Sequence, residues 1–102
     1  MHPVPCLIRL TNSEVICIDG PIFRIGKSEM MTDYAIKGCA GISRFHAEII
    51  VRHGQCYLVD RNSTNGTRVN GVSIGSNMEH LLKDGDSVYG ATYEYPVLIC
   101  RQ

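Results

Sequence analysis

The sequence has no long hydrophobic run and no excess of charge of either sign. No apolar stretch approaches the roughly 18 residues that a membrane-spanning helix requires. The opening segment Met1-His-Pro-Val-Pro5 lacks the positive charges that begin a secretory signal. We therefore expect a soluble, cytoplasmic protein that does not associate with membranes.

Paired cysteines at metal-binding or redox spacing are also missing. The chain has five cysteines, an odd number, and no C-x-x-C motif occurs. Four of the five lie within apolar runs, where a thiol behaves as a small buried hydrophobe. This usage is typical of a reducing cytosol and not of a secreted disulfide scaffold, and we expect no metal site. The cysteines stand at positions 6, 17, 39, 56 and 100.

The balance of 10 basic and 10 acidic residues argues against a general nucleic-acid-binding protein, which is usually strongly basic. The charges are unevenly distributed. Between Arg24 and Asn70 there are seven Lys or Arg and four Asp or Glu, whereas the rest of the chain has three and six. An electropositive segment in a neutral molecule suits the capture of one localised anion.

Signatures of catalysis are absent as well: there is no phosphate-cradling Walker-type loop, no paired-carboxylate site and no nucleophile elbow. Ser43 and His46 invite interpretation as a hydrolase pair. However, successive strand residues alternate faces, so these two side chains point apart unless a bend intervenes, and no third residue accompanies them. We do not expect an enzyme.

What the chain does contain is a series of short apolar runs separated by turn residues, the pattern of an all-β antiparallel sandwich. The strands that it predicts are Cys6–Leu10, Val15–Ile18, Ile22–Ile25, Phe45–Arg52, Cys56–Val59, Thr67–Val69, Ser87–Tyr89 and Tyr93–Cys100. We expect one domain over residues 1–102, with a core over about 5–100. The sequence leaves open whether that domain belongs to a larger protein.

Local signals refine this prediction. Phe45–Arg52 alternates apolar and mostly polar residues, and both His53-Gly54 and Asn70-Gly71 are typical of tight hairpins. Ser76-Asn-Met-Glu79 matches a capping box and predicts at most a turn or two of helix through Leu82. Pro96 lacks an N–H and is expected at a sheet edge or a bulge.

Three motifs along the chain are more specific than the strand pattern. Gly26-Lys27 is followed by the S-R-x-H-A segment at Ser43–Ala47, and then by Asp60–Gly71, which reads D-R-N-S-T-N-G-T-R-V-N-G. In order and spacing they resemble the loops of a forkhead-associated (FHA) domain, a phosphothreonine-binding module. The likeness covers nearly the whole chain. It implies a sandwich of about eleven short strands with the phosphate-reading loops at one end.

The resemblance implies a role for each motif. Lys27, where the family usually has arginine, would contact the phosphate as a point charge, without the bidentate fork of a guanidinium. Ser43 would donate its hydroxyl and its backbone N–H, Arg44 would contact the phosphate or peptide, Thr64 would offer its hydroxyl or N–H, and Asn65 would bind the peptide backbone.

Other residues would support the site. The resemblance implies that His46 organises the loops by hydrogen bonds, that Gly26 and Gly66 permit tight turns, and that Asn70 and Gly71 fix a hairpin beneath the third motif. It implies no cofactor. The expected partner is a phosphothreonine-containing protein, a substrate of a Ser/Thr kinase, bound as an extended peptide. The alternative is an interaction module of the same fold that binds without phosphate.

Overall fold

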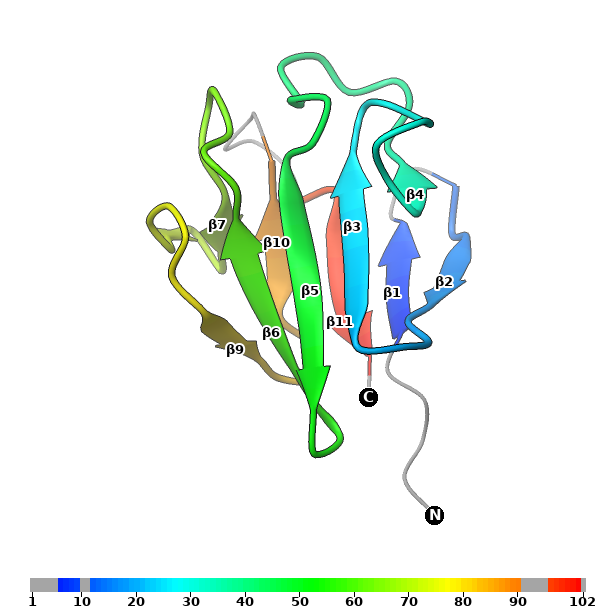
Figure 1. Ribbon diagram of the computed structural model, residues 1–102, viewed down its shortest axis with the longest axis vertical. Coiled ribbons are helices and arrows are strands. Elements are labelled where there is room, and N and C mark those ends of the chain that lie inside the picture. The colour runs from blue at the N-terminus through cyan, green and yellow to red at the C-terminus, as the bar shows by residue number, and fades with distance from the viewer. Residues whose placement is uncertain (1–5, 10–11, 91–95, 102) are drawn as a thin grey trace.

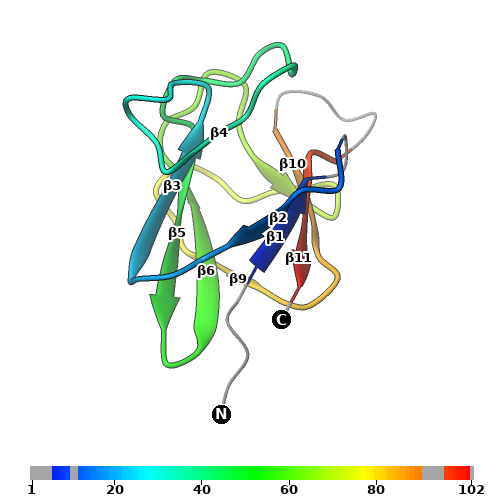
Figure 2. The ribbon, with the colours of Figure 1, turned by 90° about the vertical axis from the view of Figure 1, so that its right-hand side faces the viewer.

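The computed structural model describes residues 6–9, 12–90 and 96–101, which form two β-sheets stacked face to face (Figures 1 and 2). These residues include no helix, and so none that could cross a membrane. The strands are β1 (Cys6–Arg9), β2 (Val15–Cys17), β3 (Ile22–Gly26), β4 (Tyr34–Ala35), β5 (Ala47–Arg52), β6 (Gln55–Asp60), β7 (Arg68–Val69), β8 (Val72–Ser73), β9 (His80–Leu82), β10 (Ser87–Tyr89) and β11 (Leu98–Arg101).

One sheet has the strand order β2-β1-β11-β10-β7-β8, and the other has the order β4-β3-β5-β6-β9. The pairings between these strands are antiparallel, with one departure from the prediction: β4 pairs parallel to β3, with Ile25 opposite Tyr34. The long β5–β6 hairpin forms the centre of the second sheet, where six residue pairs lie in register from Ala47–Asp60 to Arg52–Gln55.

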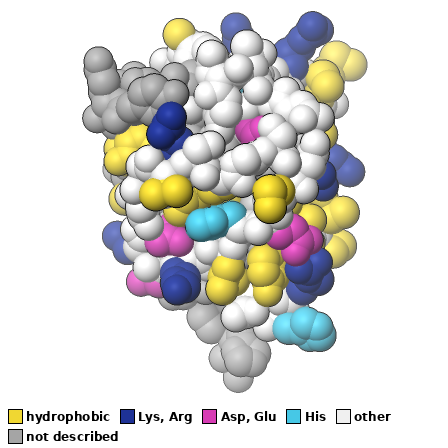
Figure 3. All heavy atoms as spheres, turned by 90° about the vertical axis from the view of Figure 1, so that its left-hand side faces the viewer, with side chains coloured by type: hydrophobic (Ala, Val, Ile, Leu, Met, Phe, Trp, Pro, Cys, Tyr) yellow, Lys and Arg dark blue, Asp and Glu magenta, His cyan; other side chains and the backbone are white. Residues whose placement is uncertain are grey.

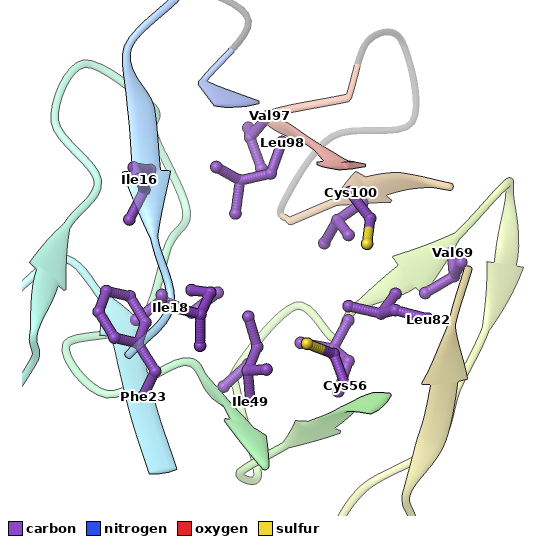
Figure 4. Close-up of a cluster of buried hydrophobic side chains, with 14 of the residues drawn as sticks. Ile16, Ile18, Phe23, Ile49, Cys56, Val69, Leu82, Val97, Leu98 and Cys100 are labelled. Carbon is purple, nitrogen blue, oxygen red and sulfur yellow. The ribbon is translucent and has the colours of Figure 1, made fainter. Parts of the chain in front are cut away.

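The core fills the space between the sheets, as Figure 4 shows. Ile49 and Leu58 reach it from β5 and β6, and Leu98 and Cys100 reach it from β11, all at most 1% exposed. Two of the apolar cysteines thus behave as expected, since Cys56 and Cys100 are buried. Cys17 does not, because it lies on the outward side of β2 and is exposed.

The eight expected strands are present, Ser87–Tyr89 with the expected bounds and the others with shifted ends. The largest shifts are at β5, which begins at Ala47 and not at Phe45, and at β11, which begins at Leu98 and not at Tyr93. Residues 93–95 of the latter prediction lie outside the described residues. Pro96 precedes β11 by two residues and lies in no strand, and β11 itself lies between β1 and β10, so the proline is not in an edge strand.

The predicted helical turn is wrong. His80–Leu82 is strand β9, paired with Cys56–Leu58 of β6. Asn77, inside the apparent capping box, has φ of 58° and donates its N–H to the Asp60 carbonyl at 2.7 Å. A left-handed residue at this position cannot begin a right-handed helix.

Both predicted hairpin turns are confirmed. The central residues have positive φ: 52° and 76° for His53 and Gly54, and 52° and 84° for Asn70 and Gly71. Positive φ at both central positions gives the turn the twist that matches the flanking strands.

Candidate functional site

Three loops meet at one end of the sandwich, the upper end in Figures 1 and 2. The first loop, residues 27–33, joins β3 to β4; the second, residues 36–46, joins β4 to β5; the third, residues 61–67, joins β6 to β7. Lys27, Ser43, Arg44, Thr64 and Asn65 therefore all belong to this end of the molecule.

The first and second loops are joined through their backbones at Gly26. The N–H groups of Lys27 and Ser28 donate to the carbonyls of Ser43 and Arg44, at 2.9 and 3.1 Å. A Cβ atom on Gly26 would lie 2.2 Å from the Arg44 carbonyl oxygen. Gly26 is not among the residues with positive φ, so its backbone torsion does not require a glycine. Glycine is required here because the two backbones approach closely.

His46 connects the second loop to the third. Its Nδ1 accepts the Ser43 backbone N–H at 3.0 Å, and its Nε2 lies 2.9 Å from the Gly66 carbonyl oxygen. Since Nδ1 must accept, the proton is on Nε2, and the ring is neutral. The side chain is only 3% exposed, and this burial lowers the pKa of His46, against the opposing effects of the Gly66 carbonyl and the Asp60 carboxylate, 4.0 Å away.

A bend at residues 44 and 45 makes the His46 contact possible. The strand geometry assumed from the sequence would have pointed residues 43 and 46 apart, but β5 begins only at Ala47. The contact involves the backbone N–H of Ser43. The Ser43 hydroxyl oxygen accepts the Thr64 N–H, and Nδ1 of His46 is occupied by the Ser43 backbone N–H, so the two residues do not form a nucleophile–base pair.

Ser43 and Thr64 bring the second and third loops together. The Thr64 backbone N–H donates to Ser43 Oγ at 2.9 Å, and the two hydroxyl oxygens lie 3.4 Å apart. The latter distance is long for a hydroxyl hydrogen bond. Both backbone N–H groups that the resemblance offered to a phosphate thus have partners within the protein, and both hydroxyls remain available as donors.

Asn65 and Gly66 shape the tip of the third loop. Asn65 donates its side-chain N–H to the Gly41 carbonyl at 2.9 Å, which ties the tip to the second loop. Gly66 has φ of 82°, a conformation that favours glycine, and its carbonyl faces His46.

Asp60 is a supporting residue that the sequence argument quoted within the third motif but did not assign. Its carboxylate is 1% exposed and accepts hydrogen bonds from Thr67 Oγ1 (2.6 Å), the Ser63 N–H (3.2 Å), Ser76 Oγ (3.3 Å) and the Ser63 hydroxyl. Four donors on one buried carboxylate fix both ends of the third loop. The signal was present in the sequence as an Asp followed by Ser and Thr residues.

Asn70 and Gly71 lie apart from this cluster, in the turn between β7 and β8. Asn70 bonds to β10 and the residue before it: its Oδ1 accepts the Ser87 N–H and its Nδ2 donates to Asp86, both at 2.9 Å. The pair therefore anchors the strand that follows the third loop, and it does not line the space between the three loops.

Of the four basic residues in the three loops, Lys37 and Arg61 are paired with Glu29 and Glu48, which leaves Lys27 and Arg44. Both side chains are exposed, and neither forms an ion pair or hydrogen bond with any residue that the structure describes. Basic side chains are visible at this end of the molecule in Figure 3. Lys27 is joined to Ser43 through the backbone, and Arg44 follows Ser43 in the chain, so two cations and two hydroxyls share this end of the molecule and favour an oxyanion as ligand.

The sequence profile of the FHA domain matches residues 23–89, a span that contains all three loops. The chain belongs to the FHA domain family. FHA domains are interaction modules and not enzymes. No curated protein sequence matched the chain.

Solved FHA domains share the architecture. One, studied for phosphothreonine-dependent FHA interactions, is 25% identical, with a TM-score of 0.80 over 98% of this chain and 97% of that one. An FHA domain of an Arabidopsis thaliana hypothetical protein is 26% identical, with a TM-score of 0.83 over 98% and 86%. The FhaA FHA domain, solved in complex with the intracellular domain of Rv3910, is 26% identical, with a TM-score of 0.77 over 95% and 99%.

Proposed function

We propose that this FHA domain binds phosphothreonine in partner proteins and so mediates phosphorylation-dependent protein–protein interaction. The observation that carries the proposal is the junction of Ser43 and Thr64 beside the exposed cations of Lys27 and Arg44. The solved FHA domain described as phosphothreonine-dependent supports it. The partner would be a substrate of a Ser/Thr kinase, met in the cytoplasm.

The available groups match the demands of a phosphate. Phosphothreonine carries a charge of about −1.5 to −2 and three strong acceptor oxygens. Lys27 and Arg44 supply the opposite charge, and the hydroxyls of Ser43 and Thr64 supply neutral donors. The backbone hydrogen bonds from Lys27 and Ser28 to the second loop fix the main chain that carries Lys27, Ser43 and Arg44 before any ligand arrives. The main chain of the site then loses little conformational freedom on binding, which favours affinity.

Asn65 would hold the peptide itself. Its bond to Gly41 fixes the carboxamide and leaves Oδ1 and the second N–H to face an extended backbone. Backbone contacts of this kind position a peptide without reading its side chains. Phosphate recognition and peptide orientation would therefore come from adjacent residues of the third loop, Thr64 and Asn65.

We also propose that the domain has no catalytic activity of its own. In a hydrolase, a histidine nitrogen would accept the proton of the attacking serine hydroxyl. Here Nδ1 of His46 accepts the Ser43 backbone N–H, and Nε2 donates to Gly66. Neither nitrogen can act as the base for Ser43.

Titration of the purified domain with a phosphothreonine peptide library tests the binding proposal, beside matched unphosphorylated and phosphoserine libraries. Each charge-assisted hydrogen bond contributes roughly 1.5–3 kcal/mol, so removing the phosphate should weaken binding on the order of a hundredfold or more. Phosphoserine should bind more weakly than phosphothreonine, because it lacks the methyl group.

The substitution Ser43→Ala should reduce phosphopeptide affinity by about tenfold, since it removes one donor and the Thr64 contact. Ser73→Ala, at an exposed position of β8, is the matched control and should bind normally. Equal binding of phosphorylated and unphosphorylated peptides, or no binding by the folded domain, would support the alternative of a phosphate-independent interaction module.

A further inference from the structure

Two adjacent methionines project from the first loop. Met30 is 98% exposed, the highest value among the large hydrophobic side chains that the structure describes, and Met31 is 48% exposed. Methionine is flexible and polarisable, and it recurs on protein surfaces that bind varied apolar partners. The groups assigned to phosphate and peptide backbone leave these two side chains without a role.

The loop that carries them is well ordered by its own hydrogen bonds. The Met31 N–H donates to the carbonyl and to the hydroxyl oxygen of Ser28, both at 3.3 Å, and Thr32 Oγ1 donates to the Ser28 carbonyl at 2.6 Å. Asp33 closes the loop by accepting the Arg24 N–H at 2.8 Å. The exposed methionines are thus held on a defined turn and not on a loose segment.

The same loop is continuous with the phosphate-binding groups. Its base is fixed by the bonds from Lys27 and Ser28 to the second loop. Met30 is three positions after Lys27 in the chain, so their Cα atoms lie at most about 11 Å apart. An extended peptide advances about 3.3 Å per residue, so a peptide held at Lys27 can reach Met30 within about three residues.

The electrostatics of the loop also suit an apolar contact. Glu29, the acidic residue next to Met30, pairs with Lys37 of the second loop at 3.0 Å. Its charge is therefore balanced within the protein. A phosphopeptide approaching Lys27 meets an apolar surface at Met30 and Met31 and no unbalanced negative charge from Glu29.

We propose that Met30 and Met31 select phosphothreonine peptides that carry a large apolar side chain within about three residues of the phosphothreonine. The inference rests on the proposed phosphothreonine binding and adds a sequence preference to it. Aliphatic or aromatic side chains of the ligand would pack on the two thioethers, while the phosphate occupies the cations and hydroxyls.

An oriented phosphothreonine library tests this selection on the wild-type domain and on the double variant Met30→Gln/Met31→Gln. Glutamine keeps the length and flexibility of methionine and removes its apolar character. The wild type should enrich Leu, Ile, Met or Phe at one flanking position. The double variant should lose roughly tenfold in affinity for such a peptide, and should bind a peptide with Ala at that position as the wild type does.

The control is Met78→Gln, since Met78 is 65% exposed on the β8–β9 loop, outside the three loops. This variant should keep the apolar preference. Phosphothreonine binding with no apolar enrichment, or with enrichment that survives the double variant, overturns the inference and leaves the proposed function intact. Absence of phosphothreonine binding by the folded wild type overturns both.

Discussion

At the scale of single residues, the site depends on how closely two backbones approach. Gly26 has the shortest such contact, since an added Cβ would meet three backbone atoms of Arg44 and His46 between 2.2 and 2.9 Å away. Backbone atoms cannot move aside as a flexible side chain can. The identity of this residue therefore determines whether the first and second loops can be joined.

Gly26→Ala should destabilise the domain by about 2 kcal/mol or more, because the added methyl group would break two backbone hydrogen bonds. These are the bonds from Lys27 to Ser43 and from Ser28 to Arg44. Urea denaturation measures the loss. Gly20→Ala is the comparison: Gly20 has no atom within 4 Å of an added Cβ but has φ of 96°, so it should lose only about 1–2 kcal/mol and keep normal peptide binding. If Gly26→Ala bound phosphopeptide as the wild type does, the joining of the two loops would not matter for function.

At the scale of elements, the third loop owes its shape to Asp60 at the end of β6. The loop follows Asp60, the last residue of β6, and ends seven residues later at Thr67, the residue before β7. The Asp60 carboxylate bonds to groups at both ends of that interval and to Ser76 beyond it. A single buried anion thus sets the spacing at which Thr64 and Asn65 are presented.

Asp60→Asn should lower the free energy of unfolding by about 2–3 kcal/mol, because an amide N–H₂ replaces one acceptor oxygen among four donors. Peptide affinity should fall as well, since the loop loses its support. Thermal denaturation and peptide titration measure the two effects. Asp19→Asn, at an exposed position of the β2–β3 connection, should change stability by no more than about 0.5 kcal/mol. Equal effects at both positions would contradict the assignment.

The elements also show where sequence is sufficient and where it is not. Asn70-Gly71 and His53-Gly54 were predictable because two-residue turns with positive φ have a local signature. Strand β4 has two residues and pairs parallel, and β9 was hidden by an apparent capping box, so both depend on contacts distant in sequence.

The site divides in the same way. Its residue types could be found from motif order and spacing. The hydrogen bonds within the site could not be predicted, because each joins residues that only the folded chain brings together. They are the bonds of the Ser43 N–H to His46, of Asn65 to Gly41 and of three hydroxyls to Asp60.

At the scale of the whole molecule, the net charge is zero but the charged residues are unevenly distributed. The chain has ten basic and ten acidic residues, yet Lys27 and Arg44 stand exposed at the loop end. Recognition of an anion by exposed cations is screened by salt. It also depends on pH through two groups, the ligand phosphate, which starts to gain a second proton near pH 6, and His46 in the protein.

The contribution of His46 can be separated from that of the phosphate by measuring stability without ligand. Burial holds the pKa of folded His46 below its ordinary value of 6.5, so between these two values the unfolded chain binds more protons than the folded domain. Stability should therefore be constant with respect to this group above about pH 7 and fall as pH decreases below about 6.5, by up to about 1.4 kcal/mol per unit.

Urea denaturation between pH 7.5 and 5, with NMR titration of the imidazole, measures this dependence. His53→Asn, at the exposed turn where φ is 52°, should leave the dependence intact, whereas His46→Gln should remove this component of it and lower stability at pH 7.5. Protonation of His46 would replace the acceptor of the Ser43 N–H with a donor and so break this contact within the second loop, while Nε2 could still donate to the Gly66 carbonyl of the third. A pH dependence unchanged in His46→Gln would show that other groups control acid stability, and loss of peptide binding below pH 6 would then come from the phosphate alone.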